Sequence, residues 1–408
     1  MPRTTHKTGT EMIIIVVIIL SVLLSSVQTA FATSQSPQTL PKHQAAPTYL
    51  SLSKFHLRGL DGPYHTQGHL IYGADNHPYL FHGVVRDDLE YLCKGDGHYT
   101  PQELAYMGLG NSSAKGTYWG ANAIRIPLSE NFWLYGSPSQ HCRPSDYHAF
   151  IKKIVDTLIG LQLNVILNLQ WTNAGGQSPS AGDGWALPDS DSVVFWKQIA
   201  PIYQSYDNVL FEIYNEPHIY TSNNWSCWRN GCQVYNDASG GHDHSNYNYM
   251  GVGMQTLLDA IRHTGANNLV LAGGLDWGYD LSQIPTYHLS GSNVVYDTHP
   301  YSYGLKLPGY WDAAFGNISA IYPVISAESG VYDCSTQYMQ QLFNYFDSHN
   351  IGWIGWAWVV SNSDPCHYPQ IIDNYTGSPI NGMGQLEYRH LQSYLTLLAN
   401  QEVPERKK

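Results

Sequence analysis

The chain has few charged residues, and basic residues are the minority among them. Only 13% of its 408 residues are Asp, Glu, Lys or Arg, and 32 acidic residues outnumber 20 Lys and Arg. Binding to nucleic acid needs a basic face, so this balance argues against a nucleic-acid partner. The sequence also lacks a phosphate-binding glycine loop and a serine elbow motif, which removes two common enzyme classes.

The N-terminal apolar stretch is short. Ile13–Leu24 has 12 residues, whereas a membrane-spanning helix needs about 20. Arg3 and Lys7 precede it, and Ala30-Phe31-Ala32 fits a small-x-small cleavage site. This order predicts a cleaved secretory signal peptide over 1–32, and therefore a secreted protein without a membrane contact. An uncleaved membrane anchor is the alternative.

The rest of the chain is predicted to form one domain. Residues 33–54 are rich in Ser, Gln, Pro and Thr and predict a disordered lead-in. Structure is expected to begin near Phe55, and a single domain is expected over 55–400, followed by a polar tail over 401–408. We see no internal repeat and no second linker, and we expect a monomer.

Cysteine is scarce but even in number. Six cysteines in an exported chain indicate disulfides, although they allow 15 pairings. Zinc is the alternative, but no paired C-x-x-C spacing supports it, and we expect neither a metal nor a cofactor. We predict sequential pairing: Cys93 with Cys142, Cys227 with Cys232, and Cys334 with Cys366.

Short apolar runs alternate with helical patterns along the chain. Alternating strands and helices predict a parallel sheet, and eight repeats predict a closed (β/α)8 TIM barrel of the α/β class. The eight predicted strands are Tyr79–Val85, Ala123–Pro127, Asn164–Gln170, Val209–Glu216, Asn268–Leu275, Val294–Thr298, Val324–Glu328 and Ile354–Val359.

Helical periodicity is clearest in three places. Apolar faces run over 150–159, over 250–261 beginning at Met250, and over 391–398. Ahead of the first strand, Leu57–Leu80 predicts a small hairpin that caps the floor of the barrel.

Polar and aromatic residues follow the strand ends. Active sites of such barrels lie at the C-terminal ends of the strands, so these residues are expected to share one rim. They are Arg125, Gln170, Trp171, Asn215, Glu216, Trp277, His299, Tyr301, Glu328, Trp356 and Trp358.

Two of these residues are glutamates that end apolar strands far apart in the chain. Glu216 closes Phe211–Glu216, and Glu328 closes Val324–Glu328. Paired carboxylates are what a retaining glycosidase needs, because one donates a proton to the leaving oxygen while the other attacks the sugar carbon. A structural pair of carboxylates bound to Arg125 is the alternative, but barrels bury few charges without a function.

In its motifs the sequence resembles glycoside hydrolase family 5, a family of cellulase-type retaining barrels in clan A. The resemblance runs from about Gly59 to Leu398. Its most specific part is Asn215-Glu216-Pro217. The supporting parts are Gly120–Pro127, His299-Pro300-Tyr301, Ala327–Gly330 and Trp356-Ala357-Trp358.

The resemblance implies a role for each residue. Glu216 would be the acid and then the base, with a raised pKa, and Glu328 would be the ionised nucleophile. Arg125 and Tyr301 would support Glu328, His299 would influence the proton of Glu216, and Asn215 would bind the sugar 2-hydroxyl. Trp358 would be the stacking floor, whereas we expect Trp356 to serve packing.

One position departs from the family pattern. The family often has a histidine at the end of strand three, where this chain has Gln170. Glutamine still exchanges hydrogen bonds but does not titrate. Trp171 and Trp277 are equally compatible with glycan subsites and with loop packing.

The sequence thus predicts a secreted retaining endo-β-1,4-glucanase that acts on polysaccharides or oligosaccharides. The alternatives within the family are a β-mannanase, a xylanase and a xyloglucanase. A transglycosylase and a non-catalytic carbohydrate-binding barrel are further alternatives, although a binding protein would usually have lost one of the two glutamates.

Overall fold

The computed structural model describes residues 49–109, 117–173, 182, 185–235, 248–333, 335–361 and 369–401, all within the unit Thr48–Lys408. The predicted signal peptide and most of the predicted lead-in lie outside these residues, as does the tail beyond Gln401. Near the start of the described residues, Leu50 N–H donates to Asn350 Oδ1 at 2.6 Å, and Asn350 Nδ2 donates back to the Leu50 carbonyl at 2.8 Å.

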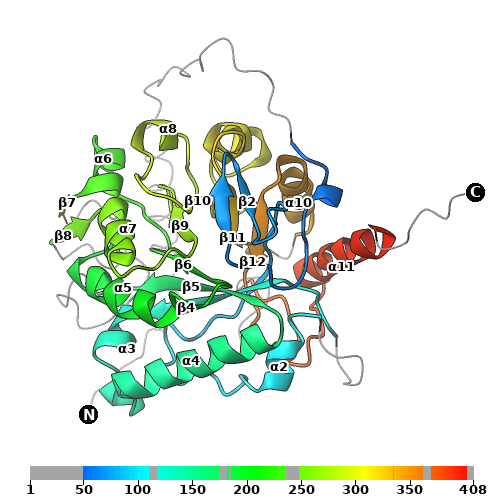
Figure 1. Ribbon diagram of the computed structural model, residues 1–408, viewed down its shortest axis with the longest axis horizontal. Coiled ribbons are helices and arrows are strands. Elements are labelled where there is room, and N and C mark those ends of the chain that lie inside the picture. The colour runs from blue at the N-terminus through cyan, green and yellow to red at the C-terminus, as the bar shows by residue number, and fades with distance from the viewer. Residues whose placement is uncertain are drawn as a thin grey trace, which may run out of the picture. The chain divides into compact units, whose positions relative to one another are not determined.

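Eight parallel strands close into a barrel, which confirms the predicted (β/α)8 fold (Figure 1). Each strand pairs with the next in chain order, and the last pairs with the first. The strands are β3 (His82–Val85), β4 (Ala123–Ser129), β5 (Asn164–Trp171), β6 (Val209–Glu212), β9 (Val270–Gly273), β10 (Val294–Asp297), β11 (Val324–Ser329) and β12 (Gly352–Gly355).

Two predicted strands each end four residues later than the observed strand. β6 ends at Glu212, although the backbone still bonds to both neighbouring strands through Ile213 N–H to Leu271 O and Asn215 N–H to Leu169 O, each at 3.0 Å. β12 covers 352–355 rather than 354–359. Beyond Gly355 the backbone still bonds to both neighbouring strands, through Trp356 N–H to Ser329 O and Trp358 N–H to Val85 O, but Ala357 N–H between them turns to the Pro369 carbonyl.

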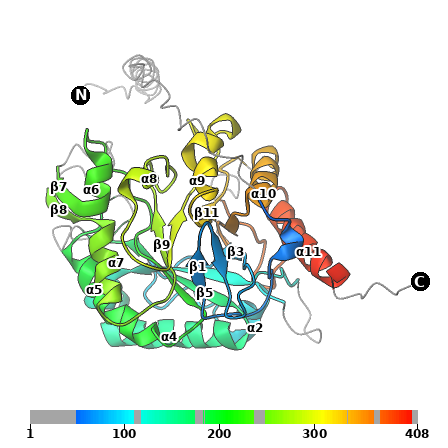
Figure 2. The same ribbon diagram turned by 45° about the horizontal axis from the view of Figure 1, so that its top comes forward.

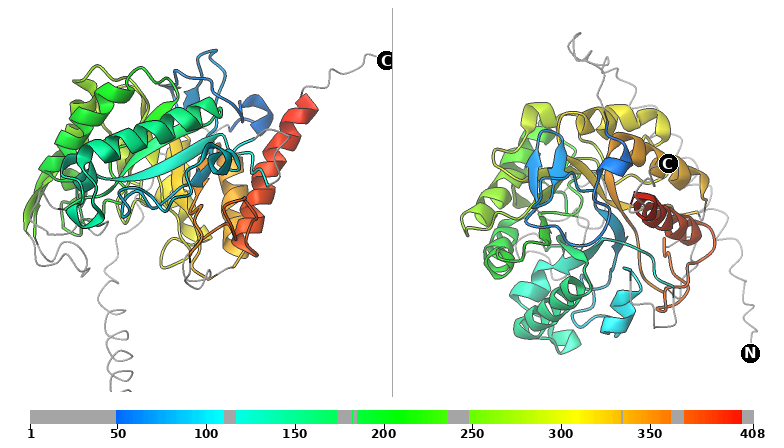
Figure 3. Two further views of the ribbon diagram at one scale, coloured as in Figure 1. Left: turned by 90° about the horizontal axis from the view of Figure 1, so that it is seen from below. Right: turned by 45° about the vertical axis from the view of Figure 1, so that its right-hand side comes forward.

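Helices cover the outside of the barrel (Figure 1, Figure 3). None of the helices in the described parts of the chain is both long and apolar enough to cross a membrane. They are α2 (Pro101–Ala105), α3 (Glu130–Leu134), α4 (Pro144–Gly160), α5 (Ser190–Tyr203), α6 (Asn224–Asn230), α7 (Met254–Arg262), α8 (Ile284–Tyr287), α9 (Asn317–Ser319), α10 (Gln337–His349) and α11 (Met383–Gln401).

The helical periodicity is largely confirmed. In α4, Ile151, Ile154, Val155 and Leu158 are buried against the barrel. The prediction was wrong for Met250, which lies in strand β8 (Tyr249–Val252) with 63% of its surface exposed. β8 pairs with β7 (Gly231–Val234) in a separate two-stranded sheet, so α7 starts only at Met254.

The predicted capping hairpin is present and consists of β1 (His65–Gln67) and β2 (Leu70–Tyr72) (Figure 2). Tyr64 and Ile71 belong to the apolar cluster that fills the barrel interior. Tyr64 O–H also donates to Asn164 Oδ1 at 2.8 Å, at the first residue of β5. The hairpin therefore closes the N-terminal end of the barrel and leaves the opposite end for a site.

Two of the three predicted disulfides are formed. Cys93 bonds to Cys142, and Cys227 bonds to Cys232. The third predicted pair, Cys334 and Cys366, lies outside the described residues.

Candidate active site

A cavity of about 670 Å³ opens at the C-terminal end of the barrel. Carboxylates, an amide and many aromatic rings line it, as expected for the active-site end of this fold. The lining residues are Glu90, Tyr91, Gln170, Trp171, Glu216, Tyr220, Asp276, Trp277, Tyr301, Tyr303, Glu328, Tyr332, Trp356 and Pro369.

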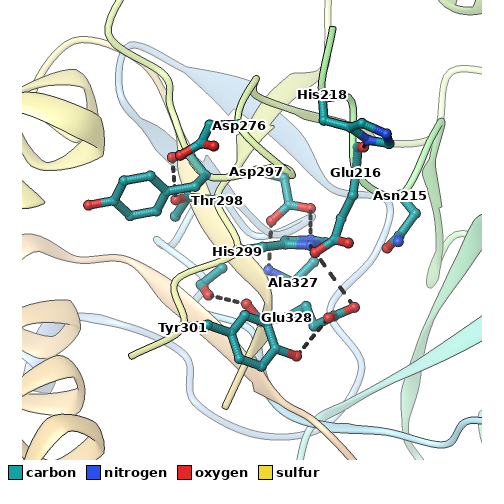
Figure 4. Close-up of polar contacts among 12 residues, drawn as sticks. Asn215, Glu216, His218, Asp276, Asp297, Thr298, His299, Tyr301, Ala327 and Glu328 are labelled. Atoms are coloured by element: carbon teal, nitrogen blue, oxygen red, sulfur yellow. Dashed lines mark hydrogen bonds and ion pairs between the residues drawn. The ribbon is translucent and has the colours of Figure 1, made fainter. Parts of the chain in front are cut away.

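The two predicted glutamates meet in this cavity. Glu328 lies in β11, and Glu216 follows the end of β6 by four residues. A carboxylate oxygen of Glu216, a ring nitrogen of His299 and a carboxylate oxygen of Glu328 all lie within 4.8 Å of one another. Figure 4 shows Glu216 and Glu328 on opposite sides of a small space beside His299. A bond lying between them is accessible to both carboxylates.

Arg125 is fully buried and holds three of the surrounding groups. Its Nη1 donates to Glu328 Oε2 at 2.9 Å, and its Nη2 donates to Asn215 Oδ1 at 2.7 Å. It also binds Glu212, a residue that the sequence reasoning missed, through two bonds of 2.6 Å. The sequence pattern could have indicated this residue. Glu212 is two residues from Leu210, which lies in the barrel interior, so strand alternation turns Glu212 toward the interior as well.

The burial of Glu212 has a clear electrostatic consequence. Burial raises the pKa of Glu212 to about 7, although the neighbouring Arg125 opposes this rise. Asn168 Nδ2 donates a further hydrogen bond to Glu212 Oε1 at 2.8 Å. Glu212 is therefore an interior group that fixes the guanidinium and does not line the cavity.

His299 lies between two carboxylates. Its Nδ1 is 3.2 Å from Glu216 Oε1, and its Nε2 is 3.0 Å from Asp297 Oδ2 (Figure 4). Burial alone would lower the pKa of His299, but the charges of Asp297 and Glu328 outweigh burial and raise that pKa well above its ordinary value. The Ala327 N–H donates to Asp297 Oδ1 at 2.7 Å and holds this second carboxylate in place.

The pKa values of the two glutamates differ from the sequence expectation. Burial would raise the pKa of Glu216, but the hydrogen bond and charge of His299 lower it. Burial raises the pKa of Glu328, helped by the charge of Glu216 and opposed by His299 and Arg125. The pKa shift of Glu216 therefore runs opposite to the predicted one, because the neighbouring His299 stabilises the ionised carboxylate.

Tyr301 and Lys306 complete the polar surroundings. Tyr301 O–H donates to Glu328 Oε1 at 2.7 Å, as the sequence suggested. Lys306, which the sequence reasoning missed, is buried, donates to the Asp276 carbonyl at 2.8 Å, and contributes to the lowered pKa of Glu216.

The remaining predicted residues also lie at the cavity. Gln170 is 6% exposed and lines it, and its Oε1 has no hydrogen-bond partner among the described residues. Trp171 lines it beside Tyr91, with ring centroids 5.9 Å apart. The ring of Trp277 stacks on that of His218 with centroids 3.6 Å apart. The backbone of Trp277 adopts the left-handed conformation with φ 60°, a strained geometry that is common at functional sites.

The assignment of Trp358 as a stacking floor was wrong. Trp358 is 1% exposed, and its ring packs edge-on against Trp119 at 5.1 Å, so neither face can meet a ligand. Trp356, which the sequence reasoning assigned to packing, lines the cavity instead. Residues two apart in a strand would share one face, but β12 ends at Gly355, so this alternation does not extend to Trp356 and Trp358.

Three groups of described residues place possible metal-ligating atoms within 4.8 Å of one another. Two of them are Glu212–Asp297–His299 and Glu216–His299–Glu328. In these groups His299 lies beside Asp297 and Glu216 as described above, and its Nε2 is 3.8 Å from Glu212 Oε1. The third is His56, Asp75 and His77, on the hairpin side of the chain.

A family model described as cellulase (glycosyl hydrolase family 5) matches residues 109–362 of this chain. The sequence is 28% identical over 245 residues to an endoglucanase of Clostridium saccharobutylicum, a match that covers 59% of this chain and 46% of that protein. It is 22% identical over 244 residues to endoglucanase A of Evansella cellulosilytica, which covers 59% and 43%. The match thus spans less than half of either relative.

Solved structures share the fold. A beta-glucanase from Saccharophagus degradans aligns with a TM-score of 0.61 at 19% identity, covering 86% of this chain and 98% of that one. The catalytic domain of a Thermobifida fusca endoglucanase aligns with a TM-score of 0.56 at 18% identity, covering 81% and 97%. With more than half of the chain matched by the family model and the barrel in place, this protein belongs to glycosyl hydrolase family 5.

Proposed function

We propose that this protein is a secreted, monomeric, retaining endo-β-1,4-glucanase. The observation that carries the proposal is the approach of Glu216 and Glu328 to within 4.8 Å across the cavity. Retaining glycosidases place their two carboxyl groups about 5–5.5 Å apart, whereas inverting enzymes separate them by about 6.5–9.5 Å to admit a water molecule. Relatives named endoglucanase support the choice of glucan.

In the first step, Glu328 attacks the anomeric carbon and forms a glycosyl ester. The bond from that carbon to the glycosidic oxygen breaks, and the oxygen takes its proton from Glu216. In the second step, Glu216 removes a proton from water, the water oxygen attacks the same carbon, and the ester to Glu328 breaks. Two inversions at one carbon retain its configuration.

The proton for the first step is held by His299 and Glu216 together. The raised pKa of His299 keeps this proton in the site near neutral pH. The 3.2 Å contact between His299 Nδ1 and Glu216 Oε1 offers a direct path for its transfer. A sugar over the site excludes water and favours the uncharged carboxyl of Glu216, so substrate binding drives the proton to the position where it is used.

The nucleophile is kept available by its donors. Arg125 Nη1 binds Glu328 Oε2, and Tyr301 O–H binds Glu328 Oε1. Both contacts stabilise the ionised carboxylate and fix its orientation, and the charge of Arg125 opposes the effect of burial on the pKa of Glu328.

Neutral sugars match the lining of the cavity. Asn215, whose Nδ2 has no partner among the described residues, and Gln170 Oε1 offer a donor and an acceptor to sugar hydroxyls. The ring faces of Trp356 and Trp277 suit the apolar faces of glucosyl units. The related beta-glucanase of Saccharophagus degradans has been solved with cellotetraose, which supports a cello-oligosaccharide here.

The deciding experiment measures reducing-sugar release by the secreted, oxidised protein on cellulose derivatives, mixed-linkage β-glucan, xyloglucan, mannan and xylan. We expect β-glucans to be preferred, and the first product formed, followed by NMR, to be the β-anomer. Glu328→Gln should abolish turnover but retain oligosaccharide binding. An α-anomer as first product, or full activity of Glu328→Gln, would overturn the mechanism, and a preference for mannan or xylan would overturn the substrate.

A further inference from the structure

A second cavity adjoins the cavity at the glutamates at Tyr91. Tyr91 lines both cavities, and the second has a volume of about 810 Å³. The second cavity lies between the loop that follows β3 and the segment that follows β12. One side chain thus forms a wall common to both spaces.

The direction of a bound glucan follows from the order of the strands. The leaving sugar lies on the side of the acid Glu216, and this side carries Tyr220 and Trp277, which follow β6 and β9. Tyr91 and Trp356 follow β3 and β12, which lie next to each other on the other side of Glu328's strand β11. The second cavity is therefore reached from the non-reducing end of the chain.

The second cavity presents one ring that is rigidly held yet exposed. His98 stacks on Tyr375 with ring centroids 3.9 Å apart and an interplanar angle of 13°. Its Nδ1 lies 2.7 Å from Glu103 Oε1, and the Tyr375 hydroxyl donates to the carboxylate of Asp96. The His98 side chain nevertheless remains 45% exposed. A ring fixed at its edge and on one face offers the other face without further loss of conformational entropy.

The same construction occurs in the first cavity, where Trp277 stacks on His218 at 3.6 Å with an interplanar angle of 2°. The two stacked pairs therefore lie in two neighbouring cavities that share Tyr91 as a wall. Around His98, the second cavity is lined by Gln102, Asp373 and Asn374. Its described lining contains no lysine or arginine, so its polar groups suit the hydroxyls of a neutral sugar rather than an anion.

We propose that the second cavity is a distal subsite for glucosyl units at the non-reducing end of a bound β-glucan chain, with His98 as its stacking platform. This inference rests on the proposed function, because the two glutamates define which end of the chain lies there. It adds that long chains gain binding energy that short ones do not.

The test compares kcat/KM for cello-oligosaccharides of two to six units. For His98→Ala we expect a roughly fivefold or greater loss on the longest substrate, which corresponds to about 1 kcal/mol of binding energy, and no loss on the shortest one cleaved. Gln102→Ala, an exposed position, should show a smaller loss with the same dependence on length. The matched control is His148→Ala, which removes an imidazole stacked on Trp133 at 3.8 Å but lining neither cavity.

The outcomes are distinct. Equal loss at every length, or no loss at any length, for both His98→Ala and Gln102→Ala would overturn the distal subsite and leave the proposed function standing. A length-dependent loss in His148→Ala as large as that in His98→Ala would also overturn it. A wild-type protein inactive on every cello-oligosaccharide would overturn the proposed function and this inference with it.

Discussion

Arg125 and Glu212 form a two-point ion pair inside the barrel, with Nε and Nη2 each donating to a different carboxylate oxygen at 2.6 Å. Neither side chain is exposed to solvent. A planar guanidinium held at two corners has a fixed orientation, so its remaining Nη1 is directed at Glu328. We infer that Glu212 positions Glu328, the proposed nucleophile, through Arg125.

Replacing Glu212 by glutamine should therefore affect both stability and turnover. Leaving the buried Arg125 without its charged partner is expected to lower the free energy of unfolding by about 3 kcal/mol or more. We expect kcat to fall while KM changes little, because the orientation of Glu328 matters most as the glycosyl ester forms. Chemical denaturation and steady-state kinetics on a β-glucan measure the two effects.

The control for this variant is Asp146→Asn. Its partner Arg143 is 79% exposed, and exposed pairs contribute little to stability. If Glu212→Gln matched this control in both measurements, the positioning role would be wrong.

Asp297 should set the alkaline limit of activity. Its charge is the main influence that raises the pKa of His299 against the effect of burial. In Asp297→Asn that charge is lost, the pKa of His299 falls, and the site loses its proton at a lower pH. The alkaline limb of the kcat/KM profile is therefore expected to move to lower pH.

Thr298→Val is the matched control, because it removes the neighbouring buried hydrogen bond to the Tyr279 carbonyl, 2.8 Å long, without a change in charge. Its alkaline limb should stay in place. An unmoved limb in Asp297→Asn would show that His299 does not hold the catalytic proton.

Replacing Trp356 should mainly affect substrate binding, whereas replacing Trp358 should mainly affect stability. Trp358→Ala removes a fully buried ring and should lower the free energy of unfolding by about 3–5 kcal/mol. Trp356→Ala should leave stability closer to the wild type and lower kcat/KM on β-glucan, because it removes a ring from the wall of the cavity. Thermal unfolding and kinetics of both variants test the distinction, and the reverse pattern would restore the assignment made from sequence.

Glu387 predicts a pH dependence of stability. It is fully buried in α11, and neither carboxylate oxygen has a hydrogen-bond partner among the described residues. Burial raises the pKa of Glu387 well above the ordinary value of 4.5. The stability associated with its protonated form is therefore fully present below pH 4.5, and it is lost as the pH rises toward the pKa of Glu387 in the folded protein.

The substitution Glu387→Met removes this titration while filling a similar volume. Denaturation at pH 5 and pH 8 should show a smaller loss of stability with rising pH in the variant than in the wild type. Parallel behaviour of the two proteins would mean that Glu387 is hydrated or paired in solution.

The sequence predicted those features that depend on periodicity. Apolar runs located the strands that deliver Glu216 and Glu328, and helical spacing located α4. Periodicity does not reveal where an extended chain leaves its sheet, which is why Trp356 and Trp358 were exchanged. Alternation places Glu212 on the interior face of β6, but it does not reveal the partner of Glu212, because Arg125 lies two strands away in β4.

Loop residues were the least predictable. Tyr91 reaches the cleft from a segment without regular structure, positioned by long-range contacts such as Gln140 Nε2 to the Tyr91 carbonyl at 2.9 Å. Glu90 and Tyr303 lie in comparable loops. Contacts of this kind join residues far apart in the chain and leave no local pattern.

The Cys93–Cys142 disulfide joins the loop of Tyr91 to the segment that precedes α4, two residues from the wall between the two cavities. Neither cysteine lies in a barrel strand or next to either glutamate. We therefore expect protein produced in a reducing host to lose activity on long substrates before it loses activity on short ones. A quality check based on a small chromogenic substrate would not detect the defect.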